Sequence, residues 1–113
     1  MSALAERIRK SRQTVVETLG HRFTVLRPSH LEVLEMQQAD GGMNLRNCLK
    51  FVIGWDLKES DLVPGGVGED VPFDTDAFVL WAEDNPQAWG DIMQGIVGAY
   101  QKHAAKLEAD AGN

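Results

Sequence analysis

The residues that most resemble a ligand-binding motif are the glycines of the segment GGVG at positions 65–68. A phosphate-binding P-loop continues into Gly-Lys-Ser/Thr, because the lysine neutralises the phosphates and the hydroxyl binds Mg²⁺. Here Glu69 and Asp70 follow the glycines, and two carboxylates beside a triphosphate would repel it. We therefore expect no nucleotide at this loop.

Acidic side chains are concentrated in the segment 56–76 and are the candidate ligands for a divalent cation. They are Asp56, Glu59, Asp61, Glu69, Asp70, Asp74 and Asp76. A calcium-binding EF-hand requires the pattern D-x-D-x-D-G with a glutamate at its twelfth position, and the segment lacks this pattern. Asp74 instead fits the cap of a following helix, and we interpret the other acids as solvated loop charges.

The histidines, the cysteine and the serines lack the companions that zinc binding or catalysis needs. A zinc site takes about four ligands, and none of His21, His30 and His103 has further ligands at an established spacing. Cys48 lies on the apolar side of a predicted helix, where it fits a small core residue. The serines lack the G-x-S-x-G elbow of hydrolases. We therefore expect no metal, no cofactor and no enzymatic activity.

The length, composition and charge of the chain indicate what kind of protein it is and which partners are disfavoured. Its 113 residues are 43% hydrophobic, which suits a single domain, 1–113, with a core. The net charge of −6 and the pI of about 4.9 disfavour binding to nucleic acid, and we interpret the basic segment 7–12 as a solvated helix face.

No apolar run reaches the ~18 residues of a membrane span. The N-terminus lacks the apolar region of a signal peptide, so we expect a cytoplasmic protein without a membrane partner.

The first elements of the chain are predicted to be a short helix and a hairpin. Residues 3–10 are weakly amphipathic and predict the helix. Residues 14–27 predict a β-hairpin, because two runs rich in β-branched residues flank the pair Gly20-His21. This pair is typical of a two-residue type II′ turn with a positive φ at Gly20.

Capping residues and apolar periodicity predict four further helices. Their ranges are 29–38, 44–54, 75–83 and 86–107. Ser29 and Glu32 have the spacing of a capping box, and Asn44, Asp74 and Asn85 are the predicted N-caps of the other three. Together these elements predict an α+β fold that is predominantly α-helical, with the N-terminal β-hairpin packed on a bundle of about four helices.

The helix over 86–107 is the longest predicted element, and its apolar residues recur every three or four positions on one face. They are Trp89, Ile92, Met93, Ile96, Val97, Tyr100 and Leu107. Pro86 suits the first turn, where a missing N–H costs nothing. The residues after 108 are expected to fray. Between Trp55 and Asp74, the glycines, prolines and acids of 58–72 predict a long loop.

Six residues are candidate partner-binding positions: Leu62, Val63, Val67, Val71, Gly95 and Gly98. The first four are apolar residues without periodicity in the loop 58–72, so they either pack onto the helices or bind a partner. The two glycines lie inside the long helix, where each costs about 1 kcal/mol relative to alanine. This cost favours the close approach of another backbone, such as that of a second copy; a helix of imperfect stability is the alternative.

Several segments occur in a fixed order along the chain. They are RFTVLRPSHLE at 22–32, VIGWD at 52–56, VPFD at 71–74, and Asn85-Pro86 with the helix that follows. A Gly-Trp pair, a glycine-rich acidic loop and VPFD before a terminal helix carry most of the similarity. Over residues 14 to 105 this order resembles the tail assembly chaperones of long-tailed bacteriophages.

The resemblance implies a small, mostly helical protein of the host cytoplasm that is absent from the mature virion. Proteins of this family engage the tape measure protein and recruit tail tube subunits around it. The family also implies self-association and often a longer, frameshifted product. Such a protein would cover long apolar helices through exposed apolar side chains and multivalent contacts. The alternative is a structural minor tail or head–tail connector component that is retained in the virion.

Overall fold

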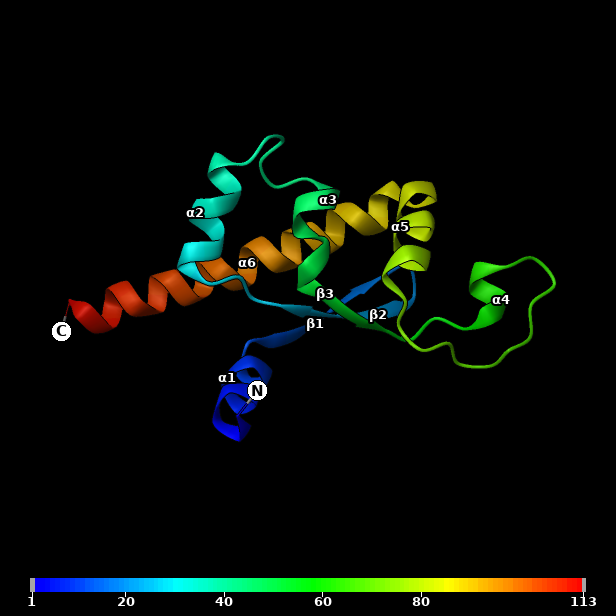
Figure 1. The fold of residues 1–113 in the computed structure, drawn as a ribbon, viewed down its shortest axis with the longest axis horizontal. Coiled ribbons are helices and arrows are strands. Elements are labelled where there is room, and N and C mark those ends of the chain that lie inside the picture. Colours follow the sequence, from blue (N-terminus) through cyan, green and yellow to red (C-terminus); the bar gives the residue numbers. More distant parts are fainter. Residues whose placement is uncertain (1, 113) are drawn as a thin grey trace.

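The computed structural model describes residues 2–112 and combines helices with a small antiparallel sheet (Figure 1). In chain order the elements are α1 (Ala3–Ser11), β1 (Gln13–Thr18), β2 (His21–Leu26), α2 (His30–Gln38), α3 (Leu45–Cys48), the 3₁₀ turn η1 (Leu49–Phe51), β3 (Val52–Trp55), α4 (Glu59–Leu62), α5 (Thr75–Asp84) and α6 (Pro86–Ala111). The expected fold class, α+β and predominantly helical, is confirmed. The hairpin, however, is part of a three-stranded sheet.

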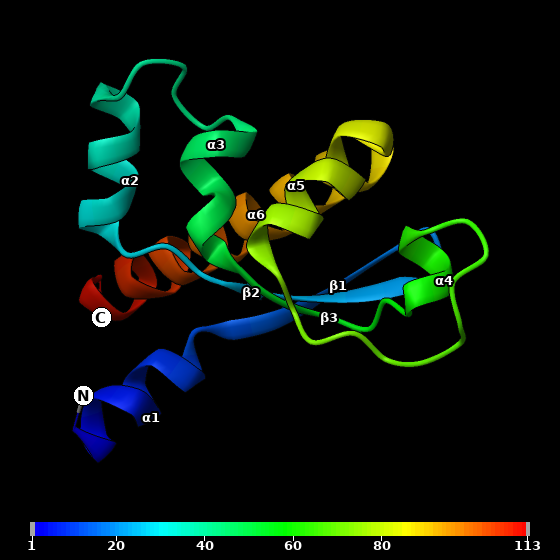
Figure 2. The same ribbon diagram turned by 45° about the vertical axis from the view of Figure 1, so that its right-hand side comes forward.

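The sheet has the strand order β1-β2-β3, and both strand pairs are antiparallel. Val16 pairs with Phe23, which in turn pairs with Trp55. Directly opposite residues share one face of a sheet, and α6 packs across this face (Figure 2). The opposite face carries exposed polar side chains such as Glu17 and Arg22, whose charged groups are 3.3 Å apart. The sheet therefore positions the core on the side of α6.

The core lies between the sheet and the helices that cover it. Its most buried side chains are Phe23, Val25, Cys48, Phe51, Leu57, Phe78, Ile92 and Ile96. Ile92 and Ile96 confirm the apolar face predicted for α6, whereas Leu107 is exposed on the end of α6 that extends beyond the sheet (Figure 1). Thr18 Oγ1 donates a hydrogen bond of 2.7 Å to Asp91 Oδ2, which joins the end of β1 to α6.

The local caps of three helices agree with the sequence. Ser29 Oγ accepts from Glu32 N at 3.1 Å and Glu32 Oε1 accepts from Ser29 N at 2.9 Å, so the capping box is confirmed. The side chains of Asn44 and Asp74 cap α3 and α5 in the same way. These caps fix where each helix begins, because each satisfies a backbone N–H that the helix leaves unpaired.

The junction between α5 and α6 differs from the prediction. Pro86 is the first residue of α6, as expected, but the Asn85 side chain makes no capping bond to that helix. Its Nδ2 instead donates to the Trp81 carbonyl at 2.8 Å, because α5 ends there with unpaired carbonyls. At its other end α6 continues to Ala111 and not to the predicted residue 107.

The hairpin turn lies one residue earlier than predicted. Thr18 pairs with His21, so the two turn residues are Leu19 and Gly20, with φ of 52° and 78°. Two positive φ values define a type I′ turn rather than the expected type II′. A leucine is unusual there because the left-handed conformation crowds its Cβ. The register is therefore set by the pairing of the strands and not by the preference of the turn residue.

The helix predicted over 44–54 is wrong in its second half. The helical turns end at Phe51, and Val52–Trp55 form β3 beside β2. Gly54 is consequently a strand residue opposite Thr24, and not the residue that follows a helix. Valine, isoleucine and tryptophan favour strands, and pairing with β2 satisfies backbone groups that a helix would have paired internally.

The segment 58–72 is more ordered than the predicted loop. It contains the single-turn helix α4, and Lys58 pairs with Asp70 both as an isolated β-bridge and through an ion pair of 2.8 Å. Glu59 N donates to the Glu69 carbonyl at 3.0 Å, and Ser60 N to the Val67 carbonyl at 2.9 Å. These bonds close the segment on itself, so α4 is held at a fixed place near α5.

The expected core position of Cys48 is confirmed, and the three tryptophans also contact the core. Cys48 is fully buried, and burial raises the pKa of its thiol. Trp55, Trp81 and Trp89 all pack against the core and are partly buried.

Among residues 2–112, no helix is long and apolar enough to cross a bilayer.

Candidate partner-binding groove

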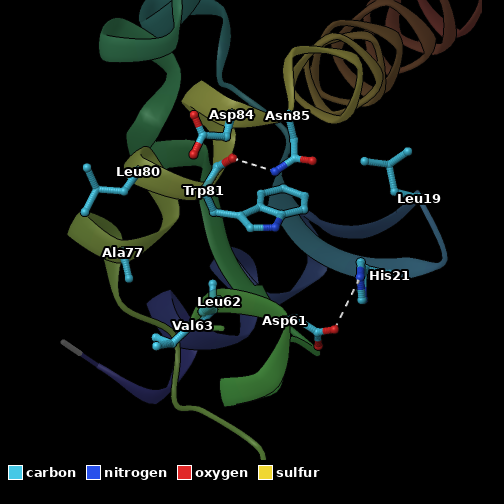
Figure 3. A pocket seen from close by; sticks show the side chains of 10 residues that line it. All are labelled: Leu19, His21, Asp61, Leu62, Val63, Ala77, Leu80, Trp81, Asp84 and Asn85. Atoms are coloured by element: carbon cyan, nitrogen blue, oxygen red, sulfur yellow. Dashed lines mark hydrogen bonds and ion pairs between the residues drawn. The ribbon is translucent and has the colours of Figure 1, made fainter. Parts of the chain in front are cut away.

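A groove of about 600 Å³ lies where the hairpin turn, α4 and α5 meet (Figure 3). Its apolar lining consists of Leu19, Leu62, Val63, Ala77, Leu80 and Trp81. Its polar rim consists of His21, Asp61, Asp84 and Asn85. We call it the α4–α5 groove. Grooves that bind other molecules commonly combine such an apolar lining with a few polar groups at the edge.

Trp81 lies at the centre of the groove and is fixed by its neighbours (Figure 3). Its ring centroid is 5.2 Å from that of Phe23 and 6.4 Å from that of Phe78, which are both core residues. The imidazole of His21 meets it at 83° with the centroids 6.3 Å apart. An indole held on several sides loses little conformational freedom when a partner contacts its open side.

The walls of the groove expose large apolar side chains. Leu80 on α5 is 67% exposed and Val63, directly after α4, is 53% exposed. On α5 the buried residues are Phe78 and Ala82, and Leu80 lies about 200° around the helix from Phe78 at 100° per residue. It therefore contributes nothing to the core side of α5 and is available at the groove.

Leu19 combines exposure with an unfavourable backbone conformation. Its side chain is 48% exposed and its φ is 52°. The left-handed conformation costs a non-glycine residue about 1–2 kcal/mol, and asparagine or glycine would fit this turn better. Unfavourable backbone conformations of this kind cluster at functional sites. Leu19 therefore lines the groove in a backbone conformation that is unfavourable for leucine.

The surroundings of the groove are strongly acidic. Residues 56–84 contain nine carboxylates and one lysine. At the rim His21 lies between two of them, with Nδ1 3.6 Å from Asp56 Oδ1 and Nε2 4.0 Å from Asp61 Oδ1. An apolar groove within this negative potential favours a ligand that carries positive charge beside its apolar face.

The four apolar loop residues predicted to bind a partner have different locations. Leu62 and Val63 line the α4–α5 groove. Val67 is exposed outside the groove, and its carbonyl accepts the bond from Ser60. Val71 is partly buried, and its carbonyl accepts from Trp55 Nε1 at 2.8 Å. The structure therefore brings two of the four together.

The two helix glycines lie on a different surface, between α6 and β1. A Cβ at Gly95 would collide with Cγ2 of Val16, so what packs on this glycine is a side chain of the chain's own strand β1. Gly98 has no atom within 4 Å of where its Cβ would be. The close contact at Gly95 is therefore made by a side chain of the same molecule, and not by the backbone that the sequence led us to expect.

Sequence reasoning did not identify Leu19, Leu80 and Trp81 as residues of one groove. Leu80 carried a signal, since it is out of phase with the buried face of α5. Nothing in the sequence indicated that Leu19 is exposed, because the predicted turn lies one residue later, at Gly20-His21. Trp81 packs against the core with part of its ring and lines the groove with the rest.

The described residues place no metal-binding cluster and no thiol at the α4–α5 groove. Within the described range 2–112, no three His, Cys, Asp or Glu side chains form a group that could hold a metal ion. The thiol of Cys48 is buried with its Sγ 3.7 Å from Met36 Sδ, away from the groove. Comparison of the chain with protein-family models, curated protein sequences and solved structures finds no match.

Proposed function

We propose that this chain is a non-enzymatic protein-binding factor whose α4–α5 groove holds the apolar face of a helix from its partner. The observation that carries the proposal is Leu19, an exposed leucine kept at a positive φ on the groove wall. In the free protein both its exposure and its conformation are unfavourable. A partner side chain in the groove compensates for the exposure, because burial of apolar surface stabilises a complex.

The charge around the groove indicates which helix fits. Amphipathic helices bind grooves through apolar residues spaced three or four positions apart. The nine carboxylates of residues 56–84 favour lysine or arginine on the flanks of that helix, since complementary potentials speed and orient association. The proposed ligand is therefore an apolar helix with basic flanks.

The resemblance to tail assembly chaperones gives this ligand a candidate identity. On this proposal the partner is the tape measure protein, and the chain covers its long apolar helices while tail tube subunits are recruited. It acts in the bacterial host cytoplasm and leaves before the virion matures. Two of the loop residues selected from the sequence, Leu62 and Val63, line the groove and support the proposal.

Co-expression with the tape measure protein of the same phage or prophage tests the proposal. We expect the tape measure protein to stay in solution and to co-purify with this chain. Leu80→Ala should weaken the complex about tenfold, because it removes roughly 1–2 kcal/mol of apolar burial. The matched control is Leu31→Ala on α2, a leucine that is 70% exposed against 67% for Leu80. The chaperone role is excluded if the tape measure protein stays soluble alone and never co-purifies.

Mass spectrometry of purified particles separates the proposed role from that of a structural component. An assembly factor is absent from the mature particle, whereas a minor tail or connector protein is present in a fixed number of copies. Detection of this chain at stoichiometric amounts would therefore assign it to the virion.

A further inference from the structure

A second hollow, of about 750 Å³, lies between β1 and the C-terminal half of α6. Its rim is basic and includes Arg12, Arg27, Lys102, His103 and Lys106. We call it the α6–β1 cleft. It is at the end of the molecule away from α4, where α1 and the end of α6 lie in both views (Figures 1 and 2). A chain of net charge −6 thus concentrates cations at one place.

The cations of the cleft face one another without acidic partners. In the described part of the chain, the ion pairs involve neither Arg12 nor Arg27, and neither of the two cleft lysines. Partial burial, followed by the charge of Arg12, lowers the pKa of Arg27. Burial, followed by the charges of Arg27 and Lys106, lowers the pKa of His103. A bound anion would relieve this mutual repulsion.

Glu32, the one carboxylate that lines an adjoining hollow with Arg12 and Arg27, is already engaged elsewhere. Its Oε1 accepts the capping bond from Ser29 N, and its Oε2 is 4.0 Å from Lys50 Nζ. The cations of the cleft therefore remain available to an external ligand.

The floor of the cleft is narrow and apolar. Val16, Gly95, Gly98 and Ala99 line it, and Val15 on the same strand is half exposed. The sheet order leaves β1 at an edge, so its outer side faces no strand. An exposed strand edge offers backbone groups to an extended chain. Small residues on α6 leave room for such a chain beside β1.

We propose that the α6–β1 cleft binds an extended acidic segment of a partner protein, with aliphatic side chains on the glycine floor and carboxylates on Arg12, Arg27, Lys102 and Lys106. No Trp, Tyr or Phe lines the cleft, so it lacks the stacking surface that single-stranded nucleic acids use. The chain's own acidic segment 58–70 is closed on itself by backbone bonds, so it is not available as an extended strand. This site is separate from the α4–α5 groove.

A labelled peptide of about twelve residues that alternates valine and glutamate tests the proposal by fluorescence anisotropy. We expect binding that weakens as salt is raised, and no binding of the peptide with lysine in place of glutamate. Lys102→Gln with Lys106→Gln should weaken binding about tenfold, since two ion pairs are lost. The matched control, Arg7→Gln with Arg46→Gln, removes the same charge outside the cleft and should change the affinity less than twofold.

Three results would overturn the proposal. The first is no binding of the acidic peptide to the folded protein, or an equal loss in the control variant. The second is tighter binding of a labelled oligothymidylate of similar length. The third is sedimentation showing that copies of the chain associate through these two lysines. The variant Leu80→Ala should bind the peptide normally, so a failure of the groove proposal is distinguishable from a failure here.

Discussion

Replacing Leu19 by asparagine should make this protein more stable, although most substitutions destabilise. Leu19 and Gly20 are the two residues of a type I′ turn, with φ of 52° and 78°, and Asn-Gly is the pair that such turns favour. The left-handed conformation costs leucine about 1–2 kcal/mol, and asparagine avoids most of this cost. Leu19 is also half exposed, so its loss removes little burial. We expect a net gain of roughly 0.5–1 kcal/mol in the free energy of unfolding.

Urea unfolding followed by tryptophan fluorescence measures this gain. Trp81 on α5 packs on Phe23 of the hairpin, so its fluorescence reports the loss of this packing. The unfolding midpoint should rise at constant slope, and the melting temperature should rise by roughly 2–6 °C. Gly20→Ala is the reciprocal control. It places a Cβ at a φ of 78° and should lower the stability by about 1 kcal/mol.

The same substitution should also change the affinity for the partner. Leu19→Asn should weaken the complex with the partner helix while it strengthens the fold, since the leucine lines the groove. An unchanged or lower unfolding midpoint for Leu19→Asn would refute the idea that the positive φ of Leu19 costs the fold stability. A gain in stability with unchanged partner affinity would remove Leu19 from the binding surface.

Four further substitutions have effects that follow from the structure. Gly95→Ala should destabilise by about 1–3 kcal/mol in urea, because its Cβ collides with the stiff side chain of Val16. Gly98→Ala, in open space on the same helix, should instead stabilise by about 0.5–1 kcal/mol. Ile96→Ala should cost about 2–5 kcal/mol in the same assay, since Ile96 is fully buried. Burial raises the pKa of Cys48 above its ordinary value of 9.0. The contribution of the buried thiol to stability is therefore complete well below this value and is lost as the pH rises through it towards the raised pKa of the folded state. Cys48→Ala should flatten the dependence of the urea midpoint on pH in this range.

The parts of the fold that depend on neighbours in sequence were predictable. The capping box of Ser29 and Glu32 and the caps of α3 and α5 each involve residues three positions apart, and such bonds form whatever packs nearby. The apolar face of α6 was predictable because Ile92 and Ile96 meet the same sheet.

The parts that depend on distant segments were not predictable. Val52–Trp55 becomes a strand because β2 lies beside it, and the pattern of Leu45, Cys48 and Leu49 continues in phase into that segment. The turn at Leu19 is fixed by the register between Thr18 and His21, which overrides the preference of glycine for the first position.

The candidate groove depends on distant segments even more. Residues 19, 62–63 and 77–85 converge only in the folded chain. Leu62 and Val63 are identifiable from sequence because they are apolar residues without periodicity in the predicted loop 58–72. Leu80 and Leu19 were not, because nothing local in the sequence shows which side of α5 or of the turn remains open.

The opposite charges at the two ends have a consequence for how the molecule meets its partners. The molecule is 56 Å long, with the acidic α4 at one end and the C-terminal half of α6, which carries Lys102 and Lys106, at the other (Figure 1). Charges are screened over about 8 Å at physiological ionic strength. The two poles are therefore electrically independent, and occupation of one leaves the field at the other unchanged. On the two binding proposals above, each pole captures its own ligand at its own rate, and the chain would join two unlike proteins.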